Sequence, residues 1–252
     1  MKIIKSLAVL GLLSYSGIAN SAEFKMGQSV ITVSPSIQVA SQKVGTLDKV
    51  TLNRDQPSGK VGILVSDSRS NLYASHSYET DKPDKGQVAA GEKDYNYEAC
   101  SAIGWAPKLD KLGLDLSFEN CYVDKKTDKN TGFFYATGTI EIVPKTNVFL
   151  TYGFADDGEG TQGATTGKFI AGHGYIFGIT NGFKDFDLKL AVGGMQNYQT
   201  WYQAGISRAI LGATVDLSVY SVQAENSATY VSAASQRSID RTHAILTISK
   251  SF

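Results

Sequence analysis

Apolar and polar residues alternate along most of the chain, from about residue 29 to its end. In residues 112–118, 148–154 and 186–192, every second residue is apolar and most residues between them are polar or small. Successive side chains of a β-strand point to opposite faces, so this pattern predicts strands with one apolar and one polar face. Helical periodicity is nearly absent beyond the first residues. The pattern therefore predicts an all-β chain.

Two architectures share this alternation, a β-sandwich with an apolar core and a membrane β-barrel with an apolar outside. The expected strands are 29–40, 48–54, 59–67, 96–106, 112–123, 132–143, 147–155, 172–182, 186–195, 201–210, 212–222 and 241–252. Short connections are expected at 55–58, 107–111, 144–146, 181–184 and around 211. Longer polar ones are expected at 68–95, 124–131, 155–171, 196–200 and 223–240.

Alternating short and long connections are typical of a transmembrane antiparallel up-and-down barrel with short periplasmic turns. We expect about 12 strands. Ten or 14 are the alternatives, and residues 71–79 are a candidate for an additional stretch of strand beyond the membrane. A secreted sandwich is the competing interpretation, and it predicts extraction without detergent.

The first 22 residues resemble an export signal. Lys2 and Lys5 precede a short apolar run from Leu7 to Leu13, and small residues follow up to Ala22. The run is too short to span a bilayer, so we expect a cleaved signal peptide over 1–22 and a barrel over 23–252. A retained anchor is the alternative. Equal numbers of basic and acidic residues, 24 each, give no electrostatic footprint for nucleic acid.

Aromatic residues gather near the expected strand ends, as the interfacial girdles of a membrane barrel would require. They are Trp105, Tyr122, Phe133, Phe154, Phe183, Phe186, Trp201 and Tyr202. Ordinary core aromatics are the alternative. Phe252 ends the last alternating segment and resembles the assembly signal of outer-membrane barrels, whereas Lys250 is expected to reach water at the membrane rim.

Several segments resemble the TorF-type porin family of Gram-negative bacteria. They are the run 59–66, the hairpin from Tyr97 to Tyr122, the segment 201–207 and the ending 246–252. The resemblance covers most of the chain from about residue 48. It implies a barrel in the cell outer membrane with a solute-channel role, in contact with outer-membrane lipid and lipopolysaccharide. The C-terminal strand would be recognised by the barrel-assembly machinery.

If the apolar residues face lipid, the intervening polar residues line the lumen. The charged candidates are Lys60, Glu98, Asp115, Glu119, Glu141, Asp187, Lys189, Asp216 and His243. This modestly acidic set would weakly favour cations in a narrow lumen. The alternative is that inward charges pair and plug the barrel. Arg208 shares the phase of the apolar Ala204 and Ile206, which predicts a bulge or a position at the rim.

The two cysteines share the polar phase of one hairpin. A turn centred between Asp110 and Lys111 places Cys100 directly opposite Cys121, and it pairs Trp105 with Leu116 on the other face. An oxidising periplasm then favours a structural disulfide. No histidine lies nearby in the sequence, so we expect no metal site.

No catalytic signature was found, and we expect neither enzymatic activity nor a cofactor. Some 12-stranded outer-membrane barrels are phospholipases whose His and Ser lie two positions apart on one strand. Here His76, His173 and His243 lack that serine, and the first two are expected in or beside long loops. The sequence predicts a channel for passive diffusion of small hydrophilic solutes. A non-conducting structural or adhesive surface protein is the alternative.

Overall fold

A computed structural model describes residues 21–41, 57–80, 97–123, 131–155, 173–195, 199–224 and 242–252. These residues form strands β1 (Ala22–Met26), β2 (Ser29–Ala40), β3 (Ser58–Asp67), β4 (Leu72–Thr80), β5 (Tyr97–Trp105), β6 (Lys108–Leu109), β7 (Leu112–Val123), β8 (Thr131–Val143), β9 (Thr146–Ala155), β10 (His173–Gly182), β11 (Asp187–Met195), β12 (Gln199–Ile210), β13 (Ala213–Ala224) and β14 (Thr242–Ser251). Within them, no helix is long and apolar enough to cross a membrane.

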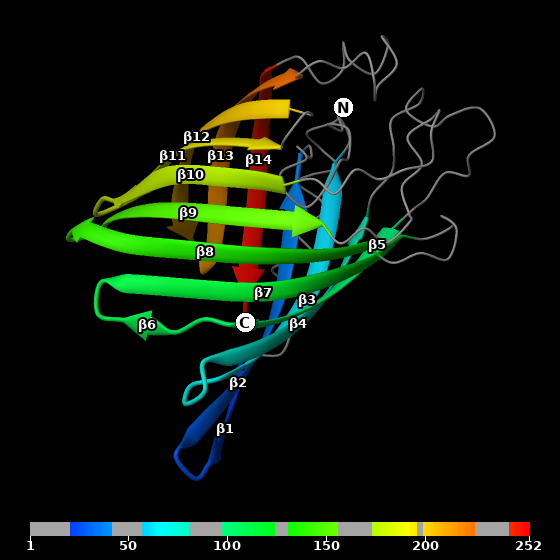
Figure 1. Ribbon diagram of the computed structural model, residues 1–252, viewed down its shortest axis with the longest axis vertical. Coiled ribbons are helices and arrows are strands. Elements are labelled where there is room, and N and C mark those ends of the chain that lie inside the picture. Colours follow the sequence, from blue (N-terminus) through cyan, green and yellow to red (C-terminus); the bar gives the residue numbers. More distant parts are fainter. Residues whose placement is uncertain are drawn as a thin grey trace.

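The strands form one antiparallel sheet that closes on itself (Figure 1). Each strand from β3 to β14 pairs with its neighbours in chain order, with β6 as a short extension beside β7. β2 closes the ring by pairing with β14 on one edge and with β3 on the other. The wall thus has 12 strands, as the sequence predicted, and β1 forms a hairpin with β2 that projects beyond it (Figure 1).

Short connections lie at one end of the barrel. Their tight geometry is visible in positive φ angles at Asn71, Asp110, Lys145 and Leu211, between 52° and 68°. Leu211 is followed by Gly212 at φ 75°, and two successive positive φ angles are typical of the two-residue turns that join antiparallel strands. The chain end at Phe252 lies at this same end, where its N–H donates to Pro35 O at 2.9 Å.

One expected connection is wrong. Residues 68–95 were predicted to be a long connection, with 71–79 as a candidate for additional strand beyond the membrane. A strand does form there, but β4 pairs with β3 and β5 along its length and belongs to the wall. The outward positions of β4 include Ala74 and His76, so its apolar alternation is too weak to read from the sequence. The expected strand 48–54 lies outside the described residues. The total of 12 is right, although one of its members is different.

Register continuity assigns each strand residue to a face, because directly paired residues point to the same side of a sheet. One face carries the buried residues Cys100, Cys121, Phe133, Trp201 and His243 and is the inner face of the closed barrel. The other carries most of the exposed large apolar side chains, among them Val61, Ile103, Leu116, Leu150, Phe177, Leu190 and Leu217. The barrel is therefore apolar outside.

The prediction of an interfacial position is wrong for two of the aromatic residues. Phe133 and Trp201 point inward, with 7% and 1% of their surfaces exposed, because each falls in the polar phase of its strand. The others lie on the outer face or in a turn, where the ring centroids of Phe183 and Phe186 are 4.7 Å apart.

Arg208 points outward, opposite Val215 in an unbroken ladder and close to the end of β12. It lies at the rim, as one of the two alternatives predicted.

Candidate functional site: the inner wall

All nine charged candidates fall on the inner face of the register. Lys60 and Glu98 lie in one row across the strands with Glu79 between them on β4. Asp187 and Asp216 share another row through Ser207. The sequence reasoning missed Glu79 because it did not place β4 in the wall. Recognising that Tyr73, Ser75, Ser77 and Glu79 share one phase would have found it.

A cavity of about 530 Å³ opens on the inner wall at the short-turn end of β7–β10. Its lining combines the inward-facing polar residues Asp115, Thr137, Thr139, Glu141, Asn147 and Thr180 with apolar residues such as Phe149 and Leu114. Asp115 Oδ1 accepts a hydrogen bond from Tyr73 Oη at 2.9 Å, and Glu141 Oε1 accepts one from Lys145 N at 2.9 Å. Hydroxyl, amide and carboxylate groups therefore face the space here, as a path for hydrated solutes requires.

The opposite part of the inner wall, over β12–β14, is packed. Trp201, Val222, Ser218 and His243 expose between 1% and 3% of their surfaces. Three polar side chains of this region are bonded to one another: Gln203 Nε2 donates to Ser218 Oγ at 3.2 Å, and Ser218 Oγ donates to Asp216 Oδ1 at 2.7 Å. Such mutual satisfaction allows polar side chains to be buried inside a barrel at low cost.

Aromatic rings of the inner face lie flat over glycines of the neighbouring strand. The four pairs are Tyr73 over Gly104, Tyr135 over Gly153, Phe149 over Gly178 and Trp201 over Gly193, and each is a direct partner in the register. A Cβ at any of these glycines would clash with the ring. The missing side chains thus let the rings lie along the wall instead of across the lumen.

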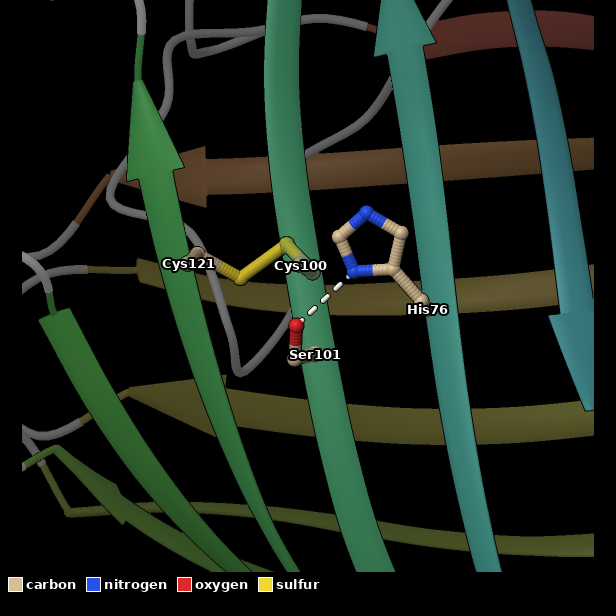
Figure 2. Close-up of a disulfide and its surroundings, with 4 residues drawn as sticks. All are labelled: His76, Cys100, Ser101 and Cys121. Atoms are coloured by element: carbon tan, nitrogen blue, oxygen red, sulfur yellow. Dashed lines mark hydrogen bonds between the residues drawn. A yellow bond between two sulfur atoms is a disulfide. The ribbon is translucent and has the colours of Figure 1, made fainter.

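The disulfide between Cys100 and Cys121 is confirmed, in the register that the sequence predicted (Figure 2). Their Cα atoms are 4.1 Å apart, close to the spacing of a non-hydrogen-bonded antiparallel pair. Phe133 and Tyr135 pack against the bridge on the inner side. Glu98 and the two sulfur atoms lie within 4.8 Å of one another, but disulfide sulfurs lack the thiolate charge that binds metals.

The barrel resembles solved structures of porins. A "KdgM porin" superposes with a TM-score of 0.56 at 12% identity, over 87% of this chain and 99% of that chain. A "NanC porin" gives 0.53 at 12% identity, over 85% and 97%. The fold is porin-like. No protein-family model and no curated protein matches the sequence.

On the outer face of this porin-like barrel, the structure joins two polar residues that the sequence kept apart. His76 was expected to be solvated beside a loop, but it lies within β4, and its Nδ1 is hydrogen-bonded to Ser101 Oγ on β5 at 2.8 Å (Figure 2). Ser101 is next to Cys100 but points to the opposite face. The search for a serine two positions from a histidine missed this pair because it spans two strands.

A base in contact with a serine is one part of a hydrolytic site, which also needs a group to orient the base and donors for an oxyanion. Within the described residues, the His76 ring otherwise meets the Tyr78 ring, edge-on at 4.8 Å, and Asn120 lies beyond Ser101 in the register. Both edges of β5 are paired, so its N–H groups are used by the sheet. The described geometry supplies a hydrogen-bonded pair without the other parts.

His173 and His243 lie in other surroundings. His173 begins β10, where its Nδ1 is hydrogen-bonded to Tyr152 Oη and its ring stacks on that tyrosine. His243 is buried on the inner face opposite Tyr220.

At the other end of β14, Lys250 Nζ lies 4.7 Å from the centroid of the Phe252 ring. Recognition of Phe252 by an assembly machinery remains a prediction.

Proposed function

We propose that this chain is an outer-membrane porin, similar to the TorF-type family, that passes small hydrophilic solutes by passive diffusion. The observation that carries the proposal is the inverted polarity of the closed barrel, with apolar side chains exposed outside and carboxylates, hydroxyls and amides inside. A soluble sandwich would bury its apolar face, whereas a barrel in lipid exposes it.

The proposal includes a location and partners. The leader would direct export and be removed, and the apolar outer wall would contact outer-membrane lipid and lipopolysaccharide. The C-terminal strand, ending at Phe252, would be delivered to the assembly machinery of a Gram-negative bacterium. The leader, residues 1–20 in particular, lies outside the described part of the chain.

Two measurements, made one after the other, test this function. Detergent-extracted membranes are first run on a gel with and without boiling, and a faster unboiled band identifies a folded barrel. The purified folded protein is then added to planar lipid bilayers, where discrete conductance steps are expected. A protein that is extracted without detergent and shows no heat shift would contradict the membrane barrel itself.

A second candidate function has its own observation. The packed wall over β12–β14 buries Trp201, Val222 and His243 in the interior, as a plugged barrel would. A non-conducting structural or adhesive protein acting through its outer loops would show the heat shift but no conductance steps. The bilayer measurement therefore decides between the two functions.

A further inference from the structure

Carboxylates dominate the charge of the inner wall. Among the described residues of the 12 wall strands, seven acidic side chains point inward, namely Glu79, Glu98, Asp115, Glu119, Glu141, Asp187 and Asp216. The inward-facing lysines of the same strands are Lys60 and Lys189. We propose that, if the barrel conducts as proposed above, it selects for cations, and that four carboxylates at the short-turn end set this selectivity.

These four residues, Asp115, Glu141, Asp187 and Asp216, are named the inner collar here. Each lies close to a short connection: Asp115 near the start of β7, Glu141 near the end of β8, Asp187 at the start of β11 and Asp216 near the start of β13. They come from four strands spread between β7 and β13, so they line the part of the mouth that these strands form. Rings of acidic side chains are a common basis of cation selectivity in channels.

Lys189 offsets only part of the charge of the inner collar, because this one ammonium group, which interacts with Asp216, faces four carboxylates. Lys189 Nζ lies 5.6 Å from the centroid of the Phe149 ring, so the side chain reaches from β11 across Gly178 of β10 to β9. Asp216 is on β13, in the opposite direction around the barrel. One ammonium group turned toward an aromatic ring leaves a net negative charge among the four carboxylates and Lys189.

Other charges at this mouth come from the connection between β5 and β7. Lys108, Asp110 and Lys111 line the rim of the cavity and are exposed. Charges on exposed side chains are screened by solvent and salt more strongly than charges inside a narrow lumen enclosed by protein of low dielectric constant. The inner collar is therefore expected to dominate, and small inorganic cations and ammonium-bearing solutes are the favoured class.

The proposal is tested by reversal potentials across bilayers under a KCl gradient. For the full-length protein we expect a potassium-to-chloride permeability ratio above one. Replacing the inner collar (D115N, E141Q, D187N and D216N together) should bring the ratio to about one. The matched control is D185N, which removes an exposed carboxylate in the β10–β11 turn. The control should keep the original ratio.

Salt provides a second prediction from the same cause. The Debye length falls from about 10 Å at 0.1 M salt to about 3 Å at 1 M, so the selectivity of the unchanged protein should weaken at the higher concentration.

If the fourfold variant fails the heat-shift test of folding, E141K alone replaces it in the measurement, since Glu141 is bonded only to a turn N–H in the described contacts. It should lower the ratio more than E141Q.

The outcomes separate this inference from the function on which it rests. Conductance steps with a ratio of one or below would overturn cation selectivity and leave the porin intact. A ratio above one that the fourfold variant and E141K leave unchanged would overturn the role of the inner collar. Folded protein without conductance would overturn the porin function and this inference together.

Swelling of protein-loaded liposomes should also be faster with glucosamine than with glucuronate, a pair of similar size and opposite charge.

Discussion

The two halves of the inner wall differ in what they do with polar side chains. Over β12–β14, Gln203 and Ser218 are buried and hydrogen-bonded, Ser218 also donates to the half-buried Asp216, and Trp201 is almost wholly buried. Over β7–β9, Asp115 and Glu141 face a cavity of about 530 Å³. The same alternation of residues thus produces a packed wall over β12–β14 and, at the short-turn end of β7–β9, a wall that faces a cavity.

This difference indicates that one part of the inner wall stabilises the barrel and another part is available to solutes. Buried side chains contribute stability through packing, and changing their volume is costly. Polar side chains that face an open cavity contribute little to packing and are available to solutes. Substitutions in the packed wall should therefore change the stability of the barrel, and substitutions in the open wall should change its conductance.

The largest effect is expected at Trp201. Replacing it by alanine should lower the free energy of unfolding by about 3–5 kcal/mol, because the ring is buried and its removal leaves a cavity. Denaturant unfolding in detergent would measure this. The control is Tyr202→Ala on the same strand, whose side chain is 50% exposed on the outer wall. Equal losses for the two variants would contradict the packed wall.

The disulfide ranks next. Cys100→Ala with Cys121→Ala should lower the free energy of unfolding by about 2–4 kcal/mol, mainly because the unfolded chain gains freedom. Reduction of the parent protein should have the same effect, and it should change the mobility of the boiled protein on a gel. A reductant that changes neither quantity would show that the bridge does not form in the protein.

The glycines beneath the rings give a direct contrast between the walls. Gly193→Val should cost about 1–3 kcal/mol, since the Trp201 ring has no free space to enter. Gly104→Val should cost less, because the Tyr73 ring is only half-buried and can swing into the lumen. That movement would break its bond to Asp115 and reduce single-channel conductance. The idea fails if Gly104→Val leaves conductance unchanged in folded protein.

The smallest stability effect is expected at Glu141. Glu141→Gln keeps an acceptor for Lys145 N and removes only the charge, so the free energy of unfolding should change by less than about 0.5 kcal/mol. Conductance for cations should nevertheless fall. Denaturant unfolding and bilayer recording on the same preparation would compare the two quantities. A large loss of stability would place Glu141 in the packed wall instead.

The hairpin of β5 and β7 shows how far sequence reasoning can go. Its turn centre alone placed Cys100 opposite Cys121 and Trp105 opposite Leu116, as the structure has them. A hairpin with a short turn has one register, and the phase of its apolar residues then fixes both faces. The strand next to it, β4, was predicted only as a candidate stretch beyond the membrane and not as part of the wall, because its outward face carries His76 and Ala74 in place of a run of large apolar residues.

Phase also explains the errors at Trp201 and Phe133. Both are aromatic residues near strand ends, and residue type suggested an interfacial girdle, but their position in the alternation assigns them to the inner face. The pairing of His76 with Ser101 was not readable at all, because it depends on which strands are neighbours. Such long-range pairs are specified by the whole sheet and not by spacing along the chain.

The sequence by itself determined that this chain forms strands with two unlike faces, and it determined which residues share a face within each strand, because the period of two is a local property of the backbone. Only the tertiary structure decided that β2 closes the ring against both β3 and β14, that β4 belongs to the wall, and which inward residues are buried or exposed. Closure and burial depend on contacts between residues far apart in the chain, so the same local pattern fits a packed wall and an open one.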